Sequence, residues 1–379
     1  MILGAAKDAF LKTISVMTRR SAVLLPAEAG DGSRTLPLST RYRVEGPRLD
    51  IDIHFEGRGW LRAVLLGYET YYPTKRLWTS GPARYEGRTL LSFDLSTGQL
   101  RSGAMLWGTI PTAAIGRRFC WRLELTSDDG RTFERMTGHY RAASTAEASS
   151  DYFQGANYVD YESQSAAGRR DAVALIEAHP FEGTALEVGC ATGALLLELQ
   201  RLGIPAMGVD FSEWAVEQAR GRVGADRVFV ADVERQGLPE PIVREAPFGA
   251  IVLHAVLEHF GDPLSVLERL TALTRPGSRI FITTTNADSL CHRLFGPDWE
   301  GYFDGTHRGV ERVTVEVLRQ WLTTLGWRIE RLDTSIIWDG SADPNHATLR
   351  DWWSADARFR ALVAEKDLGD LLTCVATRP

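Results

Sequence analysis

The 379-residue sequence has only four cysteines, and none stands at a spacing typical of metal binding. Cys120, Cys190, Cys291 and Cys374 share no CxxC pattern, which excludes the common zinc-binding modules. Four cysteines in a chain of this length also do not make the dense disulfide framework of small secreted domains. We therefore expect an intracellular, cytoplasmic protein.

Long hydrophobic runs are lacking as well. No apolar stretch approaches the roughly 20 residues that a membrane-spanning helix needs. The first residues are apolar in places, but Lys7, Asp8 and Lys12 interrupt them, and the basic pair Arg19–Arg20 follows them, the reverse of the order in a signal peptide. The sequence predicts a short amphipathic helical segment at residues 1–30 and no membrane span.

Charge of one sign is nowhere concentrated in a run, although its balance changes along the chain. Residues 1–145 contain 21 Lys and Arg against 14 Asp and Glu, whereas residues 146–379 contain 22 against 35. This change favours a domain boundary near residue 145. The basic residues of the first part are scattered through strand-like sequence, so we expect no nucleic-acid partner. They would face either an anionic substrate or the acidic second part.

The first part has the pattern of a β domain. Residues 48–55 alternate strictly between apolar and polar side chains, which is typical of a half-buried strand. Further strands are predicted at 60–66 and 89–95. Residues 117–126 and 131–140 flank a Ser-Asp-Asp-Gly turn, a hairpin signal. Short strands at this spacing predict an antiparallel β-sandwich over residues 31–145.

Large aromatic side chains of this domain permit two interpretations. They would either fill a small core, which we favour because aromatics supply much of a core's burial, or line a surface that stacks on sugars. The residues are Tyr68, Tyr71, Tyr72, Trp78 and Trp107.

An Ala- and Ser-rich stretch begins a linker at residues 146–165, and helix and strand patterns alternate from 166 to 379. Repeated βα units predict a parallel, doubly wound α/β sheet. The predicted helices are 168–179, 194–202, 212–223, 263–274 and 314–325. The predicted strands are 184–188, 205–209, 227–231, 248–253, 278–284, 326–332 and 371–377. A helical insertion at 346–364 would pack on the first domain, on another insertion or on a second chain.

A glycine loop links the first of these strands to its helix. Gly189-Cys190-Ala191-Thr192-Gly193 follows a strand and opens a helix, where small residues allow a ligand to approach the backbone and its N–H groups. Glu187 precedes the loop, and Asp210 and Asp232 end the next two strands. Helix capping is the alternative role for these two aspartates.

With these residues the second part resembles the class I S-adenosylmethionine-dependent methyltransferases. It is most similar to the small-molecule O-methyltransferases of the ubiquinone-biosynthesis type, over roughly residues 150–379. The matching motifs, in family order, are LEVGCATG, GVDFSEWAVEQAR, ADVERQGLP, FGAIVLHAVLEHFGDP and RPGSRIFITTTN. The resemblance implies a Rossmann-like seven-stranded domain over 166–379 that binds S-adenosyl-L-methionine and releases S-adenosyl-L-homocysteine.

The resemblance also implies cofactor-binding roles for individual residues. Glu187 and the backbone of Gly189, Cys190, Ala191 and Gly193 would hold the methionine portion, although Ala191 stands where the family often has glycine. Asp210 would accept hydrogen bonds from the ribose hydroxyls, and Asp232 from the adenine amino group.

Further cofactor contacts are implied around these acids. The Val233 backbone N–H would meet the adenine ring, and Phe211 would pack against its face. His254 would lie close to the transferable methyl group. Tyr158 and Tyr161 precede the first helix and would close over the cofactor, or simply pack there.

An alcohol acceptor must lose a proton, and histidine is the usual base near neutral pH. The first candidate is His259, with Glu258 beside it as the alternative. The second is His307, for which a place at a helix start is equally compatible. His307 lies in the segment 291–312, which is long and aromatic enough to form a lid.

The wall of that lid toward the acceptor would consist of Trp299, Tyr302 and Phe303. The same segment contains Asp298, Glu300 and Asp304, which suggest a magnesium-assisted mechanism. We prefer to interpret these acids as a solvated loop, because magnesium needs oxygens that converge in space. No metal is therefore expected.

The sequence as a whole predicts a two-domain O-methyltransferase acting on a small-molecule, sugar-bearing or secondary-metabolite acceptor, with a homodimer as a further expectation. Two alternatives stay open: N-methylation of an amine on such an acceptor, and a non-catalytic protein that binds cofactor or glycan with the same fold.

Overall fold

The computed structural model describes residues 38–68, 73–103, 105–111, 118–141, 150, 152–156, 158, 160–299, 301, 306–341 and 343–379. The predicted N-terminal helix at 1–30 lies outside these ranges. The described chain divides into two compact units. The first holds residues before Ser144 together with Leu290–Phe303 and Trp338–Arg360, and the second holds the remainder. No helix among the described residues is long and apolar enough to cross a membrane.

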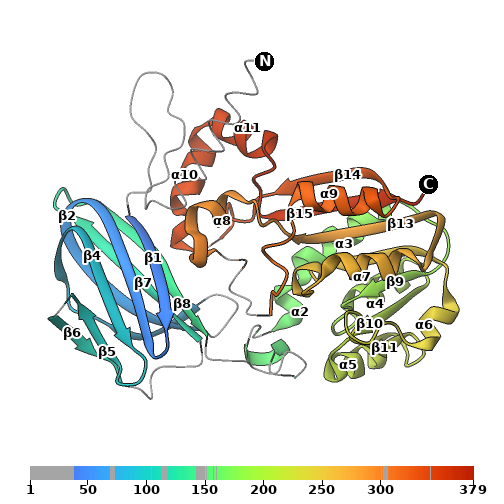
Figure 1. Cartoon of the computed structure of the whole chain (residues 1–379), viewed down its shortest axis with the longest axis horizontal. Helices are drawn as coiled ribbons and strands as arrows, with labels where there is room; N and C mark the ends of the chain where they lie inside the picture. Colours follow the sequence, from blue (N-terminus) through green and yellow to red (C-terminus); the bar gives the residue numbers. More distant parts are fainter. Residues whose placement is uncertain are drawn as a thin grey trace. The chain divides into compact units, whose positions relative to one another are not determined.

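The first unit is built on an antiparallel sheet of eight strands within the described residues (Figure 1). Its strands are β1 Leu38–Glu45, β2 Arg48–Tyr68, β3 Pro73–Thr79, β4 Ala83–Asp94, β5 Gln99–Ser102, β6 Met105–Thr109, β7 Arg118–Ser127 and β8 Thr132–Arg141. The path of hydrogen-bonded neighbours is β6-β5-β4-β2-β7-β8, with β1 and β3 also paired to β2. The antiparallel β domain is thus confirmed, and its division into two facing sheets stays a prediction.

Strand β2 differs from the expectation, because it unites the two strands predicted at 48–55 and 60–66. Its first part pairs with β1 and β4 and its later part with β7 and β3, with a register shift between His54 and Arg58. At Gly59 a Cβ atom would lie 2.3 Å from the carbonyl oxygen of Thr126. Glycine therefore permits close strand contact here and does not end the strand.

The core of this sheet follows the predicted alternation. Leu49, Ile51, Ile53 and Phe55 are buried on one face together with Trp121 of β7. Trp78 and Trp107 pack against the same core, and Tyr68 contacts His139 of β8. These three aromatics fit the core interpretation, whereas Tyr71 and Tyr72 lie outside the described residues. The hairpin β7–β8 is confirmed, with Thr126 opposite Thr132.

Two later segments complete the first unit. They contain α8 Leu290–Phe295, η4 Gly296–Asp298, η6 Pro344–His346, α10 Ala347–Ala355 and the start of α11 Ala357–Glu365. Asn345 exchanges two hydrogen bonds with the backbone of Met136 in β8, at 2.7 and 2.9 Å. The residue before the predicted insertion at 346–364 is thus bonded to β8, and His346 at its start packs against Phe295 of α8 at 5.9 Å between ring centroids.

The second unit contains a sheet of seven strands within the described residues, in the order β11-β10-β9-β12-β13-β15-β14. β15 is antiparallel to both neighbours, and the pairs among the first five strands are parallel. The strands are β9 Ala185–Val188, β10 Ala206–Asp210, β11 Val228–Val230, β12 Phe248–His254, β13 Thr274–Thr285, β14 Arg328–Ser335 and β15 Leu371–Thr377. The predicted α/β Rossmann-like fold is confirmed.

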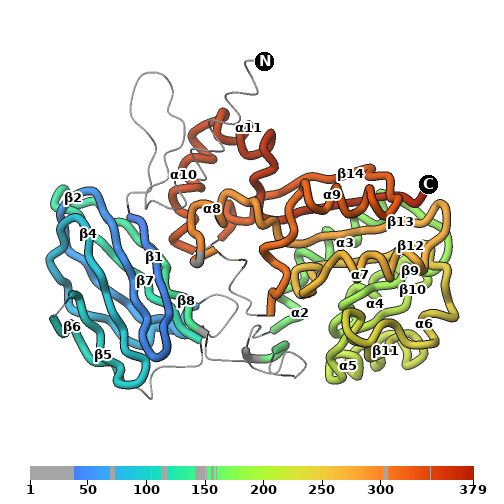
Figure 2. The backbone as a smooth tube through the Cα atoms, viewed as in Figure 1, coloured from blue at the N-terminus to red at the C-terminus, as the bar shows by residue number. Residues whose placement is uncertain are grey.

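Helices cover both faces of this sheet, and the tube in Figure 2 follows them through the unit. They are α2 Tyr161–Gln164, α3 Ala166–Ala178, α4 Ala194–Arg201, α5 Glu213–Val223, α6 Glu240–Glu245, α7 Pro263–Thr271 and α9 Val315–Thr324, with short turns η2 Tyr152–Ala156 and η3 Leu257–His259. One face packs on α6, α7 and α9, and the other on α3 and α4. The first three strands of this unit along the chain, β9, β10 and β11, extend to one side of the sheet, and the fourth, β12, lies on the other side of β9. The strand order therefore reverses beside β9, and ligands of open α/β sheets bind at such a point.

Candidate functional site

The glycine loop lies at the reversal point, immediately after β9. Gly189 and Gly193 have φ of 74° and 78°, in the left-handed region that favours glycine. A Cβ on Gly189 would come 2.4 Å from Cγ2 of Val256, and one on Gly193 would come 2.7 Å from Cβ of Ala219. Ala191 also has a positive φ, 47°, so the alanine in place of the usual glycine accepts the same turn.

Asp210 at the end of β10 is buried, and its side chain is bonded to the backbone of the glycine loop. Oδ2 accepts a hydrogen bond from the Ala191 N–H and Oδ1 one from the Ser212 N–H, both at 2.9 Å. Burial raises the pKa of Asp210, and these backbone donors oppose the rise. Because a carboxylate offers about four acceptor positions, both oxygens retain capacity for further donors.

Glu187 is the most unusual side chain of the site. It is 4% exposed, and its Oε2 has no hydrogen-bond partner among the described residues. Burial, followed by the nearby Asp210, raises its pKa well above the usual range, while Arg169 acts in the opposite direction. A buried polar atom without a partner costs free energy, so its presence indicates a ligand that supplies a donor.

The third acid and its neighbours lie at the end of β11. Asp232 Oδ1 accepts from the Arg235 N–H at 3.0 Å within a turn, so its alternative role as a helix cap is wrong, because the next helix, α6, begins only at Glu240. Val233 is buried, and its carbonyl accepts from Arg269 at 2.8 Å. Phe211 is 45% exposed, an unusual position for a large aromatic ring.

His254 ends β12 and is held by its neighbours. Its Nδ1 lies 2.6 Å from Thr283 Oγ1, and a Cβ on Gly168 of α3 would lie 3.4 Å from its ring. Burial lowers its pKa, against the opposing effect of Glu258 and Asp171. The ring is therefore positioned by packing and one hydrogen bond.

The segment before α3 packs on the glycine loop. Phe153 is buried with Ala191 and Ala215, and Tyr161 packs against this group. The ring of Tyr158 lies edge-on to Tyr161 at 4.9 Å between centroids. Burial raises the pKa of Tyr161 well above its usual value, with Tyr158, Glu187 and Asp210 adding to the rise. The tyrosine hydroxyl thus lies in the electrostatic range of both site acids.

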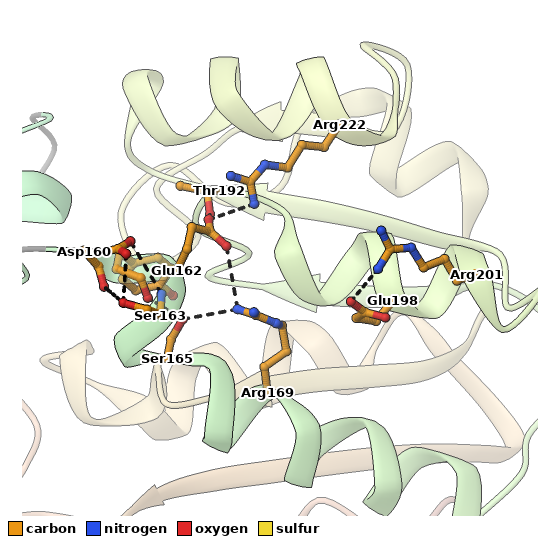
Figure 3. A network of polar contacts seen from close by, with 10 residues as sticks. Asp160, Glu162, Ser163, Ser165, Arg169, Thr192, Glu198, Arg201 and Arg222 are labelled. Atoms are coloured by element: carbon orange, nitrogen blue, oxygen red, sulfur yellow. Dashed lines mark hydrogen bonds and ion pairs between the residues drawn. The ribbon is translucent and has the colours of Figure 1, made fainter.

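Glu162 was not among the predicted site residues, yet it ties α2 to this loop (Figure 3). Its carboxylate accepts a hydrogen bond from Thr192 of the glycine loop. It also pairs with Arg222 of α5 at 2.7 Å and with Arg169 of α3 at 3.7 Å. The available sequence signal was an acid next to the tyrosine thought to cover the cofactor.

The three catalytic candidates gather after β12. Glu258 and His259 belong to η3, and the ring of His307 lies 4.6 Å from that of His259 between centroids. Glu258 is buried and accepts from Thr284 Oγ1 at 2.7 Å, and His259 Nδ1 lies 2.9 Å from Thr306 Oγ1. His307 precedes α9 by several residues and does not cap it, since that helix is capped by Thr314.

The predicted lid residues belong to the first unit or lie outside the described residues. Trp299 is 1% exposed and stacks on His292 inside the first unit, so its proposed contact with an acceptor gains no support from its position. Tyr302 and Phe303 lie outside the described residues, as do Glu300 and Asp304. Asp298 is buried, and its placement in a solvated loop is wrong.

Residues 161–332 match the family model "Methyltransferase domain". A "Ubiquinone biosynthesis O-methyltransferase" of Maricaulis maris is 33% identical over 34% of this chain and 53% of its own length. Its counterpart in Xylella fastidiosa is 28% identical over 38% of this chain and 61% of its own. The chain thus spans between half and two thirds of the length of these relatives.

Residues 161–332 form a class I S-adenosylmethionine-dependent methyltransferase domain. Solved structures of such enzymes align at lower identity. A SAM-dependent methyltransferase from Archaeoglobus fulgidus covers 60% of this chain and 96% of its own, at 19% identity and a TM-score of 0.42. The plantazolicin methyltransferase BpumL, bound to SAH, covers 57% and 88%, at 18% identity and a TM-score of 0.40.

The residues of this methyltransferase domain fit its cofactor. S-adenosylmethionine carries an ammonium group that suits the unpartnered Glu187 Oε2, and ribose hydroxyls that suit the remaining acceptor positions of Asp210. The glycine loop leaves no room for side chains beside Val256 and Ala219. An orphaned buried acid beside a loop of this kind is the arrangement that a cationic ligand completes.

Proposed function

We propose that this protein transfers a methyl group from S-adenosylmethionine to a hydroxyl group of a small-molecule acceptor. The observation that carries the proposal is the convergence of Glu258, His259 and His307 at the end of β12, next to the cofactor loop. Val256, two residues before Glu258, is the side chain against which Gly189 packs. The names of the ubiquinone O-methyltransferase relatives support transfer to oxygen.

Each cofactor-contacting residue has a role in this proposal. The bound cofactor supplies a methyl group activated by its sulfonium sulfur. Glu187 binds the ammonium group, Asp210 orients the ribose, and Asp232 with the Val233 N–H orients the adenine. Phe211 covers the adenine face. Gly189, Cys190, Ala191 and Gly193 provide the backbone around the methionine portion.

Positioning and exclusion of water account for most of the acceleration in such a displacement. Tyr158, Tyr161 and Glu162 hold the covering segment on the loop, and His254 packs behind the methyl group. The proton of the acceptor hydroxyl leaves through the group formed by Glu258, His259 and His307. His259 is the first choice for the residue that governs this step, because Thr306 fixes its ring orientation.

The acceptor itself is proposed more broadly. A sugar-bearing or secondary-metabolite acceptor would suit a chain that carries an additional β unit. An amine acceptor would need only a desolvated neutral nitrogen, and it is the alternative outcome of the test. A location in the cytoplasm and a homodimer are further expectations of the same proposal.

The experiment is a transfer assay with isotopically labelled cofactor methyl and a panel of phenols, sugar derivatives and amines. We expect label in an ether product with at least one hydroxyl acceptor, and a ~10²–10⁴-fold lower turnover for His259→Ala with cofactor affinity nearly unchanged. Label found only in amine products, or full activity in His259→Ala, would contradict the respective part of the proposal.

A further inference from the structure

One face of the sheet in the second unit changes from apolar to polar toward the carboxyl end of β13. Side chains two residues apart on a strand share a face, so the register of β12, β13 and β15 defines rows across it. One row is buried beneath α3 and consists of Val252, Phe281 and Val375. The next row is polar and half-buried, and consists of His254, Thr283 and Thr373.

The last row of this face pairs Thr285 of β13 with Leu371 of β15. Leu371 is 39% exposed, whereas its neighbour Leu372, which lies on the opposite face, is fully buried in the core that includes α9. The two faces therefore differ at this end of the sheet, and the face of α3 leaves an apolar side chain accessible. We call His254, Thr283, Thr285, Leu371 and Thr373 the β13 surface.

Three consecutive threonines end β13, and they differ in their partners. Thr283 Oγ1 lies 2.6 Å from His254 Nδ1, and Thr284 Oγ1, on the other face, donates to Glu258 at 2.7 Å. Thr285 Oγ1 is buried and has no hydrogen-bond partner among the described residues. A buried hydroxyl without a partner costs free energy, so this atom indicates a ligand that supplies one.

The β13 surface begins beside the cofactor loop. His254 precedes Val256 by two residues, and a Cβ on Gly189 of the loop would lie 2.4 Å from Val256. On its other side the His254 ring lies against the first turn of α3, where a Cβ on Gly168 would come within 3.4 Å of the ring. A ligand on the β13 surface would therefore have one end next to the cofactor loop.

We propose that the β13 surface binds the methyl acceptor through Thr285, and that this acceptor is a polyhydroxylated molecule of the sugar type. The proposal rests on the proposed function, because it assigns a subsite for the acceptor of that reaction. Threonine hydroxyls both donate and accept hydrogen bonds, as sugar hydroxyls do, and Leu371 offers an apolar contact to the C–H groups of a sugar ring.

The charges around the β13 surface fit an uncharged acceptor. None of its five side chains is a carboxylate that would select an amine. The acid next to it in register, Asp333 beside Thr373, is already paired with Arg331 at 2.5 Å. Recognition on this surface therefore depends on hydroxyl groups, and the hydroxyl of Thr285 is the one to test.

The test uses the full chain saturated with S-adenosylhomocysteine and the methyl glycosides of glucose, galactose, mannose and rhamnose as probes. Saturation-transfer NMR detects binding, and titration gives the Kd. We expect at least one glycoside to bind, with a Kd raised about 3- to 12-fold in Thr285→Val, which keeps the shape of the side chain but removes its hydroxyl. Thr285→Ser keeps the hydroxyl and should stay within about twofold of the wild type.

The control is Thr324→Val, a change at an exposed threonine of α9, which packs on the opposite face of the sheet. It should leave the glycoside Kd unchanged. S-adenosylhomocysteine affinity should stay within about twofold of the wild type in all three variants, which also shows that they fold. No glycoside bound by the wild type, or equal Kd values for Thr285→Val and Thr324→Val, would overturn the proposal.

Binding is measured without methyl transfer, so the two proposals fail separately. Glycoside binding that depends on Thr285, with no label transferred to any acceptor, would support the β13 surface and contradict the proposed function. Label transferred to a phenol, with no glycoside bound, would overturn the β13 surface and leave the proposed function standing.

Discussion

Each unit of the molecule buries an acidic side chain, but the two carboxylates differ in whether their oxygens have partners. Asp298 in the first unit accepts from Thr40 and from the Gly138 N–H, both at 3.1 Å, and pairs with the buried Arg135 at 3.4 Å. Glu187 in the second unit has an oxygen with no partner among the described residues. A fully satisfied buried acid connects parts of a fold, whereas an unsatisfied one awaits a ligand.

The positions of the two acids fit this difference. Asp298 joins β1, β8 and η4, which are separate segments of the first unit, so its partners hold the later segment on the sheet. Glu187 lies in β9 directly before the glycine loop, at the edge of the sheet where ligands bind. The comparison predicts that stability depends on Asp298 and cofactor affinity on Glu187.

The largest effect should come from Asp298→Asn. The change removes the carboxylate charge but leaves Arg135 buried, and loss of one member of a buried ion pair costs about 3–5 kcal/mol. Urea unfolding followed by tryptophan fluorescence measures it. Glu86→Gln, in an exposed ion pair with Arg58, is the control and should change stability by less than about 1 kcal/mol. Equal stability of the two variants would show that Asp298 does not hold the first unit together.

Asp210→Ala should weaken S-adenosylmethionine binding by about 10–150-fold, since hydrogen bonds to a charged group contribute about 1.5–3 kcal/mol. The loss has two sources: the ribose acceptor disappears, and the Ala191 and Ser212 N–H groups lose their partner. Calorimetry measures it, with the exposed Asp226→Ala as control. Unchanged affinity in Asp210→Ala would place the cofactor elsewhere.

The stability of the first unit should change little between about pH 4 and 6, because two buried carboxyls and two buried histidines change it in opposite directions. Burial raises the pKa of Asp298 and Asp343 to about 6, so their contribution to stability falls as pH rises from about 4 to 6. Burial lowers the pKa of His139 and His346 to about 3 from 6.5, so their contribution falls as pH drops below 6.5.

Asp343→Asn should break this balance. With one of the two carboxyls of raised pKa removed, the effect of the two histidines exceeds that of the remaining carboxyl. The free energy of unfolding should then fall by about 1.4 kcal/mol for each unit by which the pH drops from 6 to 4. Urea midpoints measured across this range give the slope. A variant whose slope equals that of the wild type would mean that Asp343 does not titrate in this window.

The smallest effect is expected at Glu162, whose ion pairs are partly exposed. Glu162→Gln should lower cofactor affinity about two- to fivefold by loosening α2 from Thr192, in keeping with about 0.2–1 kcal/mol for such pairs. The difference from the wild type should shrink in high salt, because salt screens exposed charges. An affinity loss that persists undiminished in high salt would mean that the pairs with Arg169 and Arg222 are not its cause.

Local patterns were sufficient to predict most of the second unit, because its strands and helices are set by periodicity and by the glycine loop. They failed where contacts between residues far apart in the sequence determine the bounds of a strand or the partner of a side chain. The Glu-Gly-Arg-Gly stretch at 56–59 has the composition of a turn, yet pairing with β4 on one edge and with β7 further along keeps β2 extended. Likewise, no local signal connects Asp298 with Arg135, which lie 163 positions apart.

The candidate site divides in the same way. Glu187, Asp210 and the loop glycines could be predicted as site candidates from their order along the chain, and their contacts with the cofactor stay predictions. The convergence of His259 and His307 was not predicted, since it depends on backbone contacts from Gly309 and Arg308 to η3. Glu162 was missed because a half-buried acid in a short helix has no distinguishing pattern.

The most direct test of the account is a calorimetric titration of S-adenosylmethionine into Glu187→Gln and Asp298→Asn, side by side with the wild type. The account predicts one site per chain in the wild type, affinity reduced about 10- to 100-fold in Glu187→Gln without loss of stability, and nearly normal affinity in Asp298→Asn. Wild-type affinity in Glu187→Gln, or no binding by the wild type, would contradict it.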